Sequence, residues 1–326
     1  MLRKKLVLLT VLLVTLSLMV TLSGTGASKM RFAMVTDIGG LGDQSFNDSA
    51  YDGLKLLEKE YSAEIKVLES KKAEDYIPNL KSLADQKFDM IWAIGFLMKD
   101  AVDKISAQYP NVKFGLIDDV VARPNVTSVT FREEEGSFLV GVIAGKTTRT
   151  KIVGFVGGMQ FPLIEKFEAG FKAGVKKVNP KASVFVNYVG SFADPVKGKE
   201  TALAQYTLGA DIIFHAAGDT GTGVIEAAKE KGKWAIGVDK DQHHLAPKNV
   251  LVCMIKRVDV GVFKGTKMAL EGKGGKAMNL GLKEEGIGIC KSAPTTVIPY
   301  VLDIAYKYRK DVINGRIKVP TDPKGL

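Results

Sequence analysis

The sequence predicts an α/β protein of two similar lobes, each a parallel sheet flanked by helices. Three observations support this prediction. Apolar runs that end in Gly, Asp or Ser alternate with longer stretches of helical spacing, which is typical of strand–helix–strand crossover units. The alternation restarts near residue 150. The chain of 326 residues also exceeds the usual size of one domain, so two lobes are expected.

The boundaries of the expected elements follow from where the apolar runs begin and end. In the first half, strands are expected at 30–37, 63–68, 88–95 and 112–118, with helices at 45–59, 75–86 and 98–108. In the second half, strands are expected at 152–156, 183–188, 212–216, 234–238 and 250–255, with helices at 163–178, 197–208 and 223–231. The last expected helix, at 296–314, is amphipathic.

These elements divide the chain into four parts. We expect a signal peptide at 1–27, a first lobe at 30–148 and a second lobe at 149–267. Residues 268–326 begin with a stretch rich in Gly and Lys that breaks the alternation. We expect this last part to return toward the first lobe, with the C-terminal helix packing mainly on that lobe.

The leader shows the order of features of a secretory signal. Three basic residues at 3–5 precede an apolar run at 6–20 and small residues at 25–27. A transmembrane anchor is the alternative, but the run is shorter than the roughly 20 apolar residues that span a bilayer core. No cysteine lies near the end of the run. We therefore expect cleavage to leave a soluble chain outside the cytoplasmic membrane, without a lipid anchor.

The composition excludes several classes of protein. A chain with 46% apolar and 25% charged residues is globular rather than disordered. The formal net charge is +10, but the lysines are interspersed with Glu and Asp. We find no basic helix or Arg-rich arm that could follow a phosphate backbone, so no nucleic-acid partner is expected.

The two cysteines give no sequence signal for a metal site. Cys253 and Cys290 lie far apart and neither has a CxxC partner. Both have apolar neighbours, which favours two buried free thiols. A disulfide is the alternative in an oxidising compartment.

Polar and glycine residues at the ends of the expected strands are the first candidates for a binding site. In a parallel α/β sheet, ligands bind outside the carboxyl ends of the strands, and two lobes can close on a ligand by hinge motion. The residues at these ends are Asp37, Gly95, Asp118, Gly157, Gly218 and Asp239.

The segment TDIGGLGDQSFNDSAYDGL is the most informative. A strand ends at Asp37, and a Gly-rich loop leads to a helix start at Phe46 and Asn47. The GxxxxGK and GxGxxG patterns are absent, and the carboxylates of the segment would repel phosphate. We interpret the loop as a site for an uncharged polyol or base, because an aromatic ring at a cleft-facing helix start can stack on a flat ring. Plain helix capping by Asp43 or Ser45 is the alternative.

Three later segments carry further candidates. ADIIFHAAGDTGTGVIEAAKEKG lacks the dinucleotide spacing, so no nicotinamide or flavin cofactor is expected, and His215 could have a structural or a ligand-binding role. In WAIGVDKDQ, Asp239 is placed to accept hydrogen bonds from vicinal hydroxyls, whereas Asp241 fits an Asx turn. Lys256 follows an apolar strand and precedes an expected helix with Val258, Val262 and Met268 inward, so we expect it to be paired or to reach a ribose or a carboxylate.

Catalytic patterns are weak in this sequence. The histidines are His215, His243 and His244, HExxH is absent, and the adjacent pair lacks helical ligand spacing. GxSxG is absent, and neither cysteine has a base nearby in the sequence. Carboxylates at strand ends could act as acid and base in a glycosidase, and their spacing leaves this open.

Together, four segments resemble the basic membrane protein family of ABC-transporter substrate-binding proteins, whose best-understood members bind purine nucleosides. They are TDIGGLGDQSFNDSAYDGL, GFVGGMQFPLIEKFEAGF, GADIIFHAAGDTGTGVIEAAKEKG, and AIGVDKDQ followed by MIKRVDVGV. The resemblance extends from about residue 31 to about residue 320. It implies the two-lobed type I periplasmic-binding-protein fold of the ribose-binding type, with the ligand cleft between the lobes.

The resemblance also implies contacts with the base of the ligand. Phe46 would stack on the base, and Asp37, Asn47 and Asp118 would contact it.

For the sugar, the resemblance implies that Asp239 and Lys256 hold the ribose near the glycine loop around Gly218. The second aromatic wall stays open between His215, Phe161 and Phe192. Family members are commonly lipoproteins, and this leader has no lipid-accepting cysteine.

The sequence therefore predicts an extracytoplasmic binding protein that is not an enzyme. We expect it to capture a nucleoside such as adenosine, guanosine or inosine and to deliver it to an ABC permease in the cytoplasmic membrane. We expect a monomer, with no cofactor and no metal. A binding protein for a sugar or a flavin on the same fold is the first alternative, and a secreted nucleoside-processing enzyme is the second.

Overall fold

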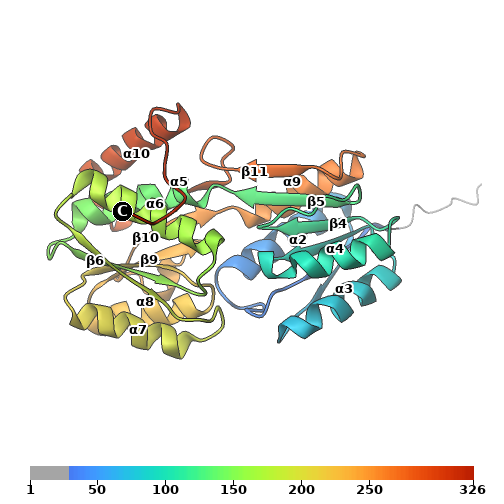
Figure 1. Cartoon of the computed structure of the whole chain (residues 1–326), viewed down its shortest axis with the longest axis horizontal. Helices are drawn as coiled ribbons and strands as arrows, with labels where there is room; N and C mark the ends of the chain where they lie inside the picture. The colour runs from blue at the N-terminus through green and yellow to red at the C-terminus, as the bar shows by residue number, and fades with distance from the viewer. Residues whose placement is uncertain (1–28) are drawn as a thin grey trace, which may run out of the picture.

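The computed structural model describes residues 29–326 and contains two lobes, each built on its own sheet (Figure 1). The expected signal peptide lies outside these residues. Both sheets have six strands, and their strand pairs are parallel except for one antiparallel pair in the second sheet. The predicted α/β class, with two parallel-dominated sheets flanked by helices, is confirmed.

The first sheet has the strand order β11-β5-β4-β3-β1-β2. Its strands are β1 (Arg31–Val35), β2 (Glu64–Leu68), β3 (Met90–Ile94), β4 (Phe114–Ile117), β5 (Val126–Phe131) and β11 (Ala277–Leu280). The helices of this lobe are α2 (Phe46–Tyr61), α3 (Tyr76–Asp85), α4 (Lys99–Gln108) and α9 (Val258–Leu270), with short helices η1 (Ala73–Asp75) and η2 (Phe96–Met98).

The second sheet has the order β12-β10-β9-β8-β6-β7, and β12 is antiparallel to β10. Its strands are β6 (Ile152–Gly157), β7 (Ser183–Tyr188), β8 (Ile212–Ala216), β9 (Trp234–Asp239), β10 (Val250–Lys256) and β12 (Ile287–Ile289). The helices of this lobe are α5 (Glu133–Thr147), α6 (Pro162–Val178), α7 (Pro195–Thr207), α8 (Thr220–Lys231) and α10 (Pro299–Ile313), with short helices η3 (His243–Leu245) and η4 (Ala293–Thr295).

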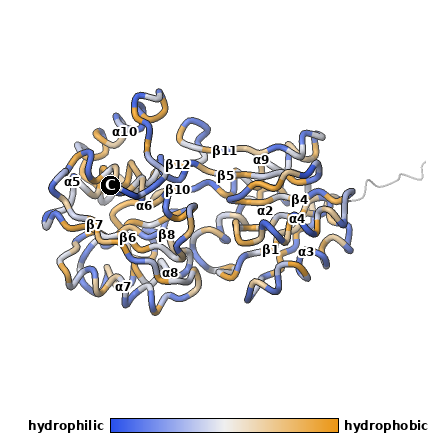
Figure 2. The backbone as a smooth tube through the Cα atoms, viewed as in Figure 1, coloured by the Kyte–Doolittle hydropathy of each residue, from blue (hydrophilic) through white to orange (hydrophobic). Residues whose placement is uncertain are grey.

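Hydropathy explains where each strand lies. The strand β3 is buried along its whole length and consists of apolar residues, as a strand covered on both faces requires. The edge strand β2 is more exposed and carries charged residues among apolar ones. Figure 2 shows apolar stretches running through the strands of both sheets.

The chain passes between the lobes after β5, after β10 and after β11. The helix α5 follows a strand of the first sheet but packs on α6, and α9 follows β10 but packs on α2. The expected boundaries at 148 and 267 place α5 in the first lobe and α9 in the second. The structure places each of these helices in the other lobe. The apolar faces of these helices would fit either sheet, and the short crossings decide which one they cover.

The C-terminal helix differs from its predicted place. It packs against α5, which contacts the second lobe, rather than mainly on the first lobe. The edge-to-face contact of Phe138 with Tyr308, at 5.8 Å between ring centroids, is part of this packing. The antiparallel strand β12 turns the chain onto the second sheet just before α10, whereas β11 in the same segment joins the first sheet.

Four elements were not expected from the sequence: β5, α5, β11 and β12. The strand β5 contains buried Thr127 and Ser128 and so lacks a continuous apolar run. The helix α5 is buried on nearly all sides and therefore shows no amphipathic pattern. The strands β11 and β12 are four and three residues long, so they depend on pairing with a neighbour.

The close crossing of α5 and α6 depends on glycines. A Cβ at Gly141 of α5 would lie 2.3 Å from the carbonyl oxygen of Phe171, and one at Gly174 of α6 would lie 2.1 Å from that of Phe138. Only backbone-to-backbone contact fits at these distances, so the glycines set the distance between the helices. Among residues 29–326, no helix is long and apolar enough to cross a membrane.

Candidate functional site

A cavity lies between the two lobes, at the carboxyl ends of strands from both sheets. Its apolar lining consists mainly of Phe46, Phe96, Leu163, Ile164, Phe167 and Phe192. Its polar side chains are Asp37, Asp43, Asn47, Asp118, Asp239 and Lys256. The predicted residue Gly218 also lines the cavity, with a φ of 56°.

The loop after β1 positions Asp37 against the start of α2. One carboxylate oxygen of Asp37, Oδ1, accepts hydrogen bonds from the backbone N–H of Gly39 (2.9 Å) and from Asn47 Nδ2 (2.8 Å). Burial raises the pKa of Asp37 to about 6, although these two hydrogen bonds partly oppose the shift. The amide oxygen Oδ1 of Asn47 is buried and has no hydrogen-bond partner among residues 29–326, so it can accept one from a ligand.

Asp43 caps the helix that carries these groups. Its carboxylate accepts hydrogen bonds from the backbone N–H groups of Ser45 (2.9 Å), Asn47 (2.8 Å) and Asp48 (3.1 Å). The capping role considered for Asp43 is therefore present, and the same residue also borders the cavity. Ser45 makes no side-chain capping bond.

Aromatic rings from both lobes form much of the cavity wall. Phe46, the first residue of α2, lines the cavity together with Phe167 and Phe192 of the second lobe. Phe96 makes edge-to-face contacts with Phe161 (5.1 Å between centroids) and Phe192 (6.4 Å), which bridge the lobes. Of the three candidates for a second aromatic wall, Phe192 lines the cavity. Sequence analysis did not single out Phe96 or Phe167, although Phe167 lies within a quoted segment.

Lys256 is buried at the base of the site and is paired within the protein. Its Nζ lies 2.6 Å from Asp118 Oδ2 and 3.1 Å from Glu133 Oε1. The ammonium also lies 5.1 Å from the centroid of the Phe46 ring and 5.7 Å from that of Phe167. Burial alone would lower the pKa of Lys256, but the neighbouring carboxylates outweigh it and raise this pKa above its ordinary value.

Glu133 was missed by sequence analysis. It is fully buried at the start of α5, and its Oε1 lies 3.1 Å from Lys256 Nζ. The available signal was a run of three glutamates that opens a largely apolar helix, since acidic residues are favourable in a first turn. That signal indicates a helix start and says nothing of burial.

Asp118 and Asp239 stand at equivalent points of the two lobes, at the carboxyl ends of β4 and β9. Both have positive φ angles, 74° and 64°, which are rare for residues other than glycine and cluster at functional sites. Burial raises the pKa of Asp118 to about 6 and that of Asp239 to about 7, while Lys256 opposes both shifts. Asp118 Oδ1 is buried and has no hydrogen-bond partner in the part of the chain that the structure describes. Asp239 Oδ2 accepts a hydrogen bond from Ser45 Oγ at 2.5 Å.

His215 does not line the cavity, so the prediction that it contacts the ligand is not supported by its position. It is fully buried, and its Nε2 lies 3.1 Å from Gln242 Oε1. Gln242 also accepts a hydrogen bond from the backbone N–H of Val238 (3.0 Å). Through Gln242, His215 thus supports the loop after β9 from the interior of the second lobe. Burial lowers the pKa of His215 to about 4, which keeps the imidazole neutral.

Further contacts hold the lobes together around the cavity. Gln242 Nε2 donates to the backbone oxygen of Gln44 at 3.1 Å, and Lys240 Nζ lies 2.6 Å from Asp52 Oδ2. With the Ser45–Asp239 bond, these contacts join the α2 region of the first lobe to the loop after β9. The structure is therefore a closed arrangement of the two lobes.

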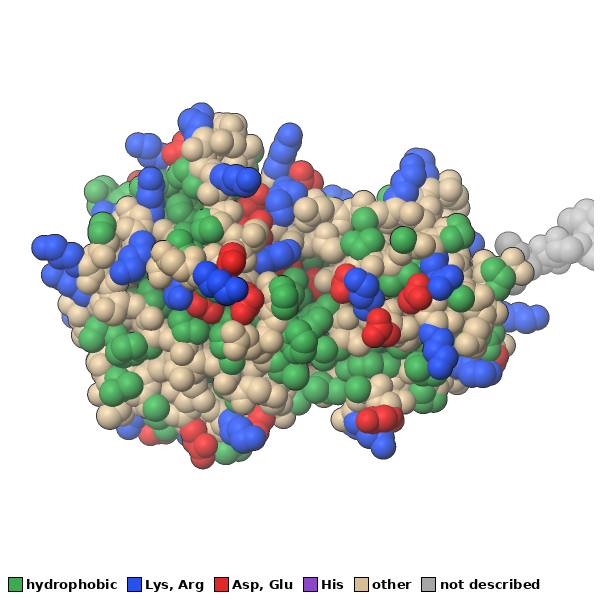
Figure 3. All heavy atoms as spheres, in the orientation of Figure 1, with side chains coloured by type: hydrophobic (Ala, Val, Ile, Leu, Met, Phe, Trp, Pro, Cys, Tyr) green, Lys and Arg blue, Asp and Glu red, His purple; other side chains and the backbone are tan. Residues whose placement is uncertain are grey.

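The charge inside the cavity differs from that on the surface. Four carboxylates line the cavity against one cation, Lys256. Such a site disfavours phosphates and other anions and suits a neutral ligand that offers N–H and O–H donors. On the face in Figure 3, Lys and Arg side chains are spread among acidic ones rather than gathered in one patch.

Comparison with known proteins gives consistent results. The family described as "ABC transporter substrate-binding protein PnrA-like" (Bmp) matches residues 30–322. The chain is 40% identical to the CD4+ T-cell-stimulating antigen of Listeria monocytogenes, over 89% of this chain and 88% of that protein. It is 36% identical to the ABC transporter nucleoside-binding protein BmpA of Lactococcus lactis, over 92% and 91% of the two chains.

A solved structure shares the arrangement of both lobes. An ABC transporter solute-binding protein of Aeropyrum pernix superposes with a TM-score of 0.83 at 27% identity. The superposition covers 91% of this chain and 94% of the other. The predicted two-lobed fold of periplasmic solute-binding proteins is thus confirmed.

Proposed function

This chain belongs to the Bmp family of PnrA-like ABC-transporter substrate-binding proteins, and from that premise we propose that it captures a purine nucleoside between its lobes. It delivers this nucleoside to a membrane permease and does not transform it. The observation that carries the proposal is the make-up of the cavity. Aromatic rings from both lobes enclose a space bordered by buried carboxylates and by amide and carboxylate oxygens that have no partner.

The base is held in the half of the cavity that the first lobe forms. Phe46 stacks on the ring, and Phe192 or Phe167 of the second lobe covers the other side. Asn47 Oδ1 and Asp118 Oδ1 accept N–H groups of the base, because each is buried and lacks a hydrogen-bond partner among the described residues. Asp37, whose pKa burial raises to about 6, contacts the same edge through its second oxygen.

The ribose lies toward the second lobe. Asp239 accepts a hydrogen bond from a ribose hydroxyl while Ser45 holds its other oxygen, and the turn at Gly218 allows close approach of the backbone. Lys256 donates one hydrogen bond to Asp118 Oδ2, and its ammonium forms an ion pair with Glu133. Another of its donors is directed at the ribose.

The protein works as a monomer at the outer face of the cytoplasmic membrane, where substrate-binding proteins of ABC importers meet their permeases. Contacts between the lobes, such as Lys240 with Asp52, close the cavity over the ligand. Opening at the three crossings between the lobes releases it.

The decisive experiment identifies what the cavity holds. The purified protein is denatured, the released small molecules are identified by mass spectrometry, and the refolded protein is titrated calorimetrically with nucleosides and with ribose. One purine nucleoside per chain, bound without turnover, supports the proposal. A free sugar, a flavin or a reaction product would overturn the ligand assignment while leaving the family unaffected.

A further inference from the structure

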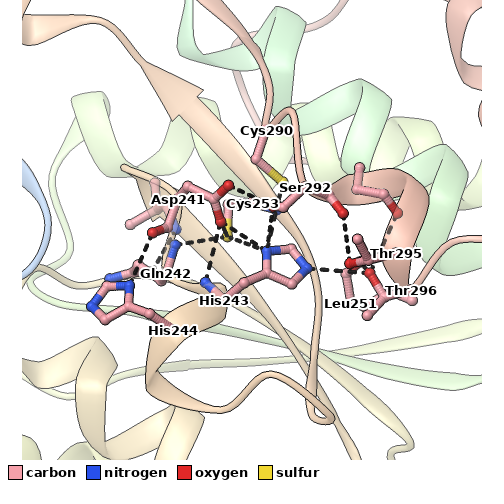
Figure 4. Close-up of polar contacts among 12 residues, drawn as sticks. Asp241, Gln242, His243, His244, Leu251, Cys253, Cys290, Ser292, Thr295 and Thr296 are labelled. Carbon is pink, nitrogen blue, oxygen red and sulfur yellow. Dashed lines mark hydrogen bonds and ion pairs between the residues drawn. The ribbon is translucent and has the colours of Figure 1, made fainter.

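Four side chains of metal-binding type come together in the second lobe, outside the ligand cavity (Figure 4). They are Asp241 in the loop after β9, His243 in η3, Cys253 in β10 and Cys290 just after β12. One ligand atom from each lies within 4.8 Å of the others, and all but Asp241 are buried. None of these residues lines the ligand cavity.

The distances approach those of a tetrahedral site. His243 Nδ1 lies 3.8 Å from Cys253 Sγ and 3.9 Å from Cys290 Sγ, and Cys253 Sγ lies 4.0 Å from Asp241 Oδ1. In tetrahedral zinc sites with Zn–S of about 2.3 Å and Zn–N of about 2.0 Å, neighbouring ligand atoms are roughly 3.5–3.8 Å apart. The short pair is His243 Nδ1 and Asp241 Oδ1, at 2.8 Å.

The hydrogen bonds around His243 point its Nδ1 into the cluster. The hydroxyl of Thr296 donates to the backbone oxygen of Leu251 at 2.6 Å, so it accepts from the N–H at His243 Nε2, 3.2 Å away. Nδ1 lies 2.8 Å from both Asp241 Oδ1 and Ser292 Oγ. A ring nitrogen without a proton and a carboxylate oxygen are both acceptors, so this contact requires either a proton on Nδ1 or a metal ion between the two atoms.

The other ligands are oriented in the same way. The backbone N–H of Gln242 donates to Cys253 Sγ at 3.2 Å, and that of Cys253 donates to Cys290 Sγ at 3.1 Å. Hydrogen bonds of this kind stabilise thiolates at metal sites. Ser292 Oγ donates to Asp241 Oδ2 at 2.5 Å, and Asp241 Oδ1, which also accepts the backbone N–H of His243 at 3.2 Å, faces His243 Nδ1.

We propose that Asp241, His243, Cys253 and Cys290 bind a zinc ion. Two thiolates, an imidazole and a carboxylate form a tetrahedral ligand set that suits Zn²⁺. The ion ties the loop after β9 to β10 and to the segment after β12. This loop begins at Asp239 in the cavity, and its Gln242 reaches Gln44 of the first lobe, so the metal fixes the part of the second lobe that closes on the ligand.

The test uses the full chain, purified with a reductant and stripped with a chelator. Elemental analysis after zinc loading is expected to give one zinc per chain. Cobalt(II) is expected to give thiolate-to-cobalt charge-transfer absorption together with the visible bands of a tetrahedral site. Saturating zinc should raise the melting temperature by about 5 °C or more.

Variants assign the site to these residues. His243→Ala and Cys290→Ser are expected to lose the zinc and the cobalt spectrum. His244→Ala is the matched control, because this neighbouring histidine is exposed and bonds to Gln44 and to the backbone oxygen of Asp241, not to a side chain of the cluster. The His244→Ala variant should keep both the zinc and the cobalt spectrum. If the His243 or Cys290 variants do not fold, the cobalt spectrum of the unaltered chain still reports on thiolate ligands.

Several results would overturn the proposal. One is a reduced, stripped chain that takes up no zinc, which would leave a proton between His243 and Asp241. Another is a purified protein that contains a Cys253–Cys290 disulfide and still binds no metal after this disulfide has been reduced. Equal zinc uptake by the unaltered chain and by both His243→Ala and Cys290→Ser would place the metal elsewhere.

Discussion

Two clusters of polar groups adjoin the loop after β9, and they differ in how their charge is balanced. The cavity cluster (Asp37, Asp118, Asp239 and Lys256) draws residues from both lobes and borders the ligand cavity. The thiol cluster (Asp241, His243, Cys253 and Cys290) lies within the second lobe.

The difference between the clusters shows how one loop can serve two tasks. Asp239 and Asp241 are two residues apart, yet the positive φ of Asp239 places its side chain in the cavity while Asp241 points to the thiols. In the cavity cluster the cation is a side chain, Lys256, so the site holds together without an ion. In the thiol cluster the proposed cation is a metal, so its stability should depend on what is bound.

Removal of the cation from the cavity cluster should have the largest effect. Lys256→Met is expected to lower the free energy of unfolding by about 3–5 kcal/mol, because Asp118 and Glu133 stay buried without their partner. Urea denaturation measures this loss. Lys267→Met, which breaks an exposed pair with Glu60, is the control and should change stability by less than about 1 kcal/mol. Similar losses in both variants would mean that the cavity cluster does not depend on its lysine.

Loss of the Asp239 carboxylate, at the start of the loop after β9, should weaken ligand binding without disturbing the thiol cluster. Asp239→Ala is expected to reduce nucleoside affinity by about 2–4 kcal/mol, because ribose hydroxyls would be buried without an acceptor. Calorimetric titration gives the value. Asp239→Asn keeps the side-chain shape and tolerates the positive φ, so it should lose less. If Asp239→Ala binds nucleoside as tightly as the parent, the ribose assignment is wrong.

Removal of the ring at the start of α2 separates base recognition from sugar recognition. Phe46→Ala should cost about 1–3 kcal/mol in nucleoside binding through lost stacking. Any binding of free ribose should weaken far less, and parallel titrations with the two ligands test this. Phe46→Leu keeps apolar cover near Lys256 and so controls for a general disturbance of the site. Equal losses for both ligands would favour a sugar site over a nucleoside site.

The smallest expected effect is a dependence of stability on pH that belongs to the cavity cluster. Burial raises the pKa of Asp239 from 3.8 to about 7, so the folded state binds this proton more tightly than the unfolded state between pH 4 and 7. The contribution of this group to stability therefore falls as pH rises through that window. The Asp239→Asn variant has no titratable group at this position and so lacks this contribution. The stability of the variant relative to the parent should rise by about 0.5–1 kcal/mol per pH unit from pH 5 to 7.

Thermal or urea unfolding of the metal-stripped parent and Asp239→Asn variant at several pH values tests this prediction. Burial lowers the pKa of His215 to about 4, which acts in the opposite direction, but that histidine is present in both proteins. A difference that does not change between pH 5 and 7 would show that Asp239 is ionised throughout.

Much of the cavity cluster could be predicted from the sequence, because strand-end residues of a parallel sheet must gather at one edge. Asp37, Asp118 and Asp239 each follow an apolar run, and all three line the cavity. His215 also ends a strand, but its side chain faces the interior, where Gln242 binds it. Position at a strand end does not specify the face from which a side chain projects.

The sequence by itself determined the α/β class, the two-sheet plan and the family, because these follow from local hydropathy and from long contiguous motifs. The tertiary structure alone decided which lobe α5, α9 and α10 cover, since a packed apolar face carries no record of its partner. It also decided that Glu133 meets Lys256, and that Cys253 and Cys290 meet His243. Such contacts join residues from separate elements, and pairing between strands brings them together at distances that no spacing in the sequence encodes.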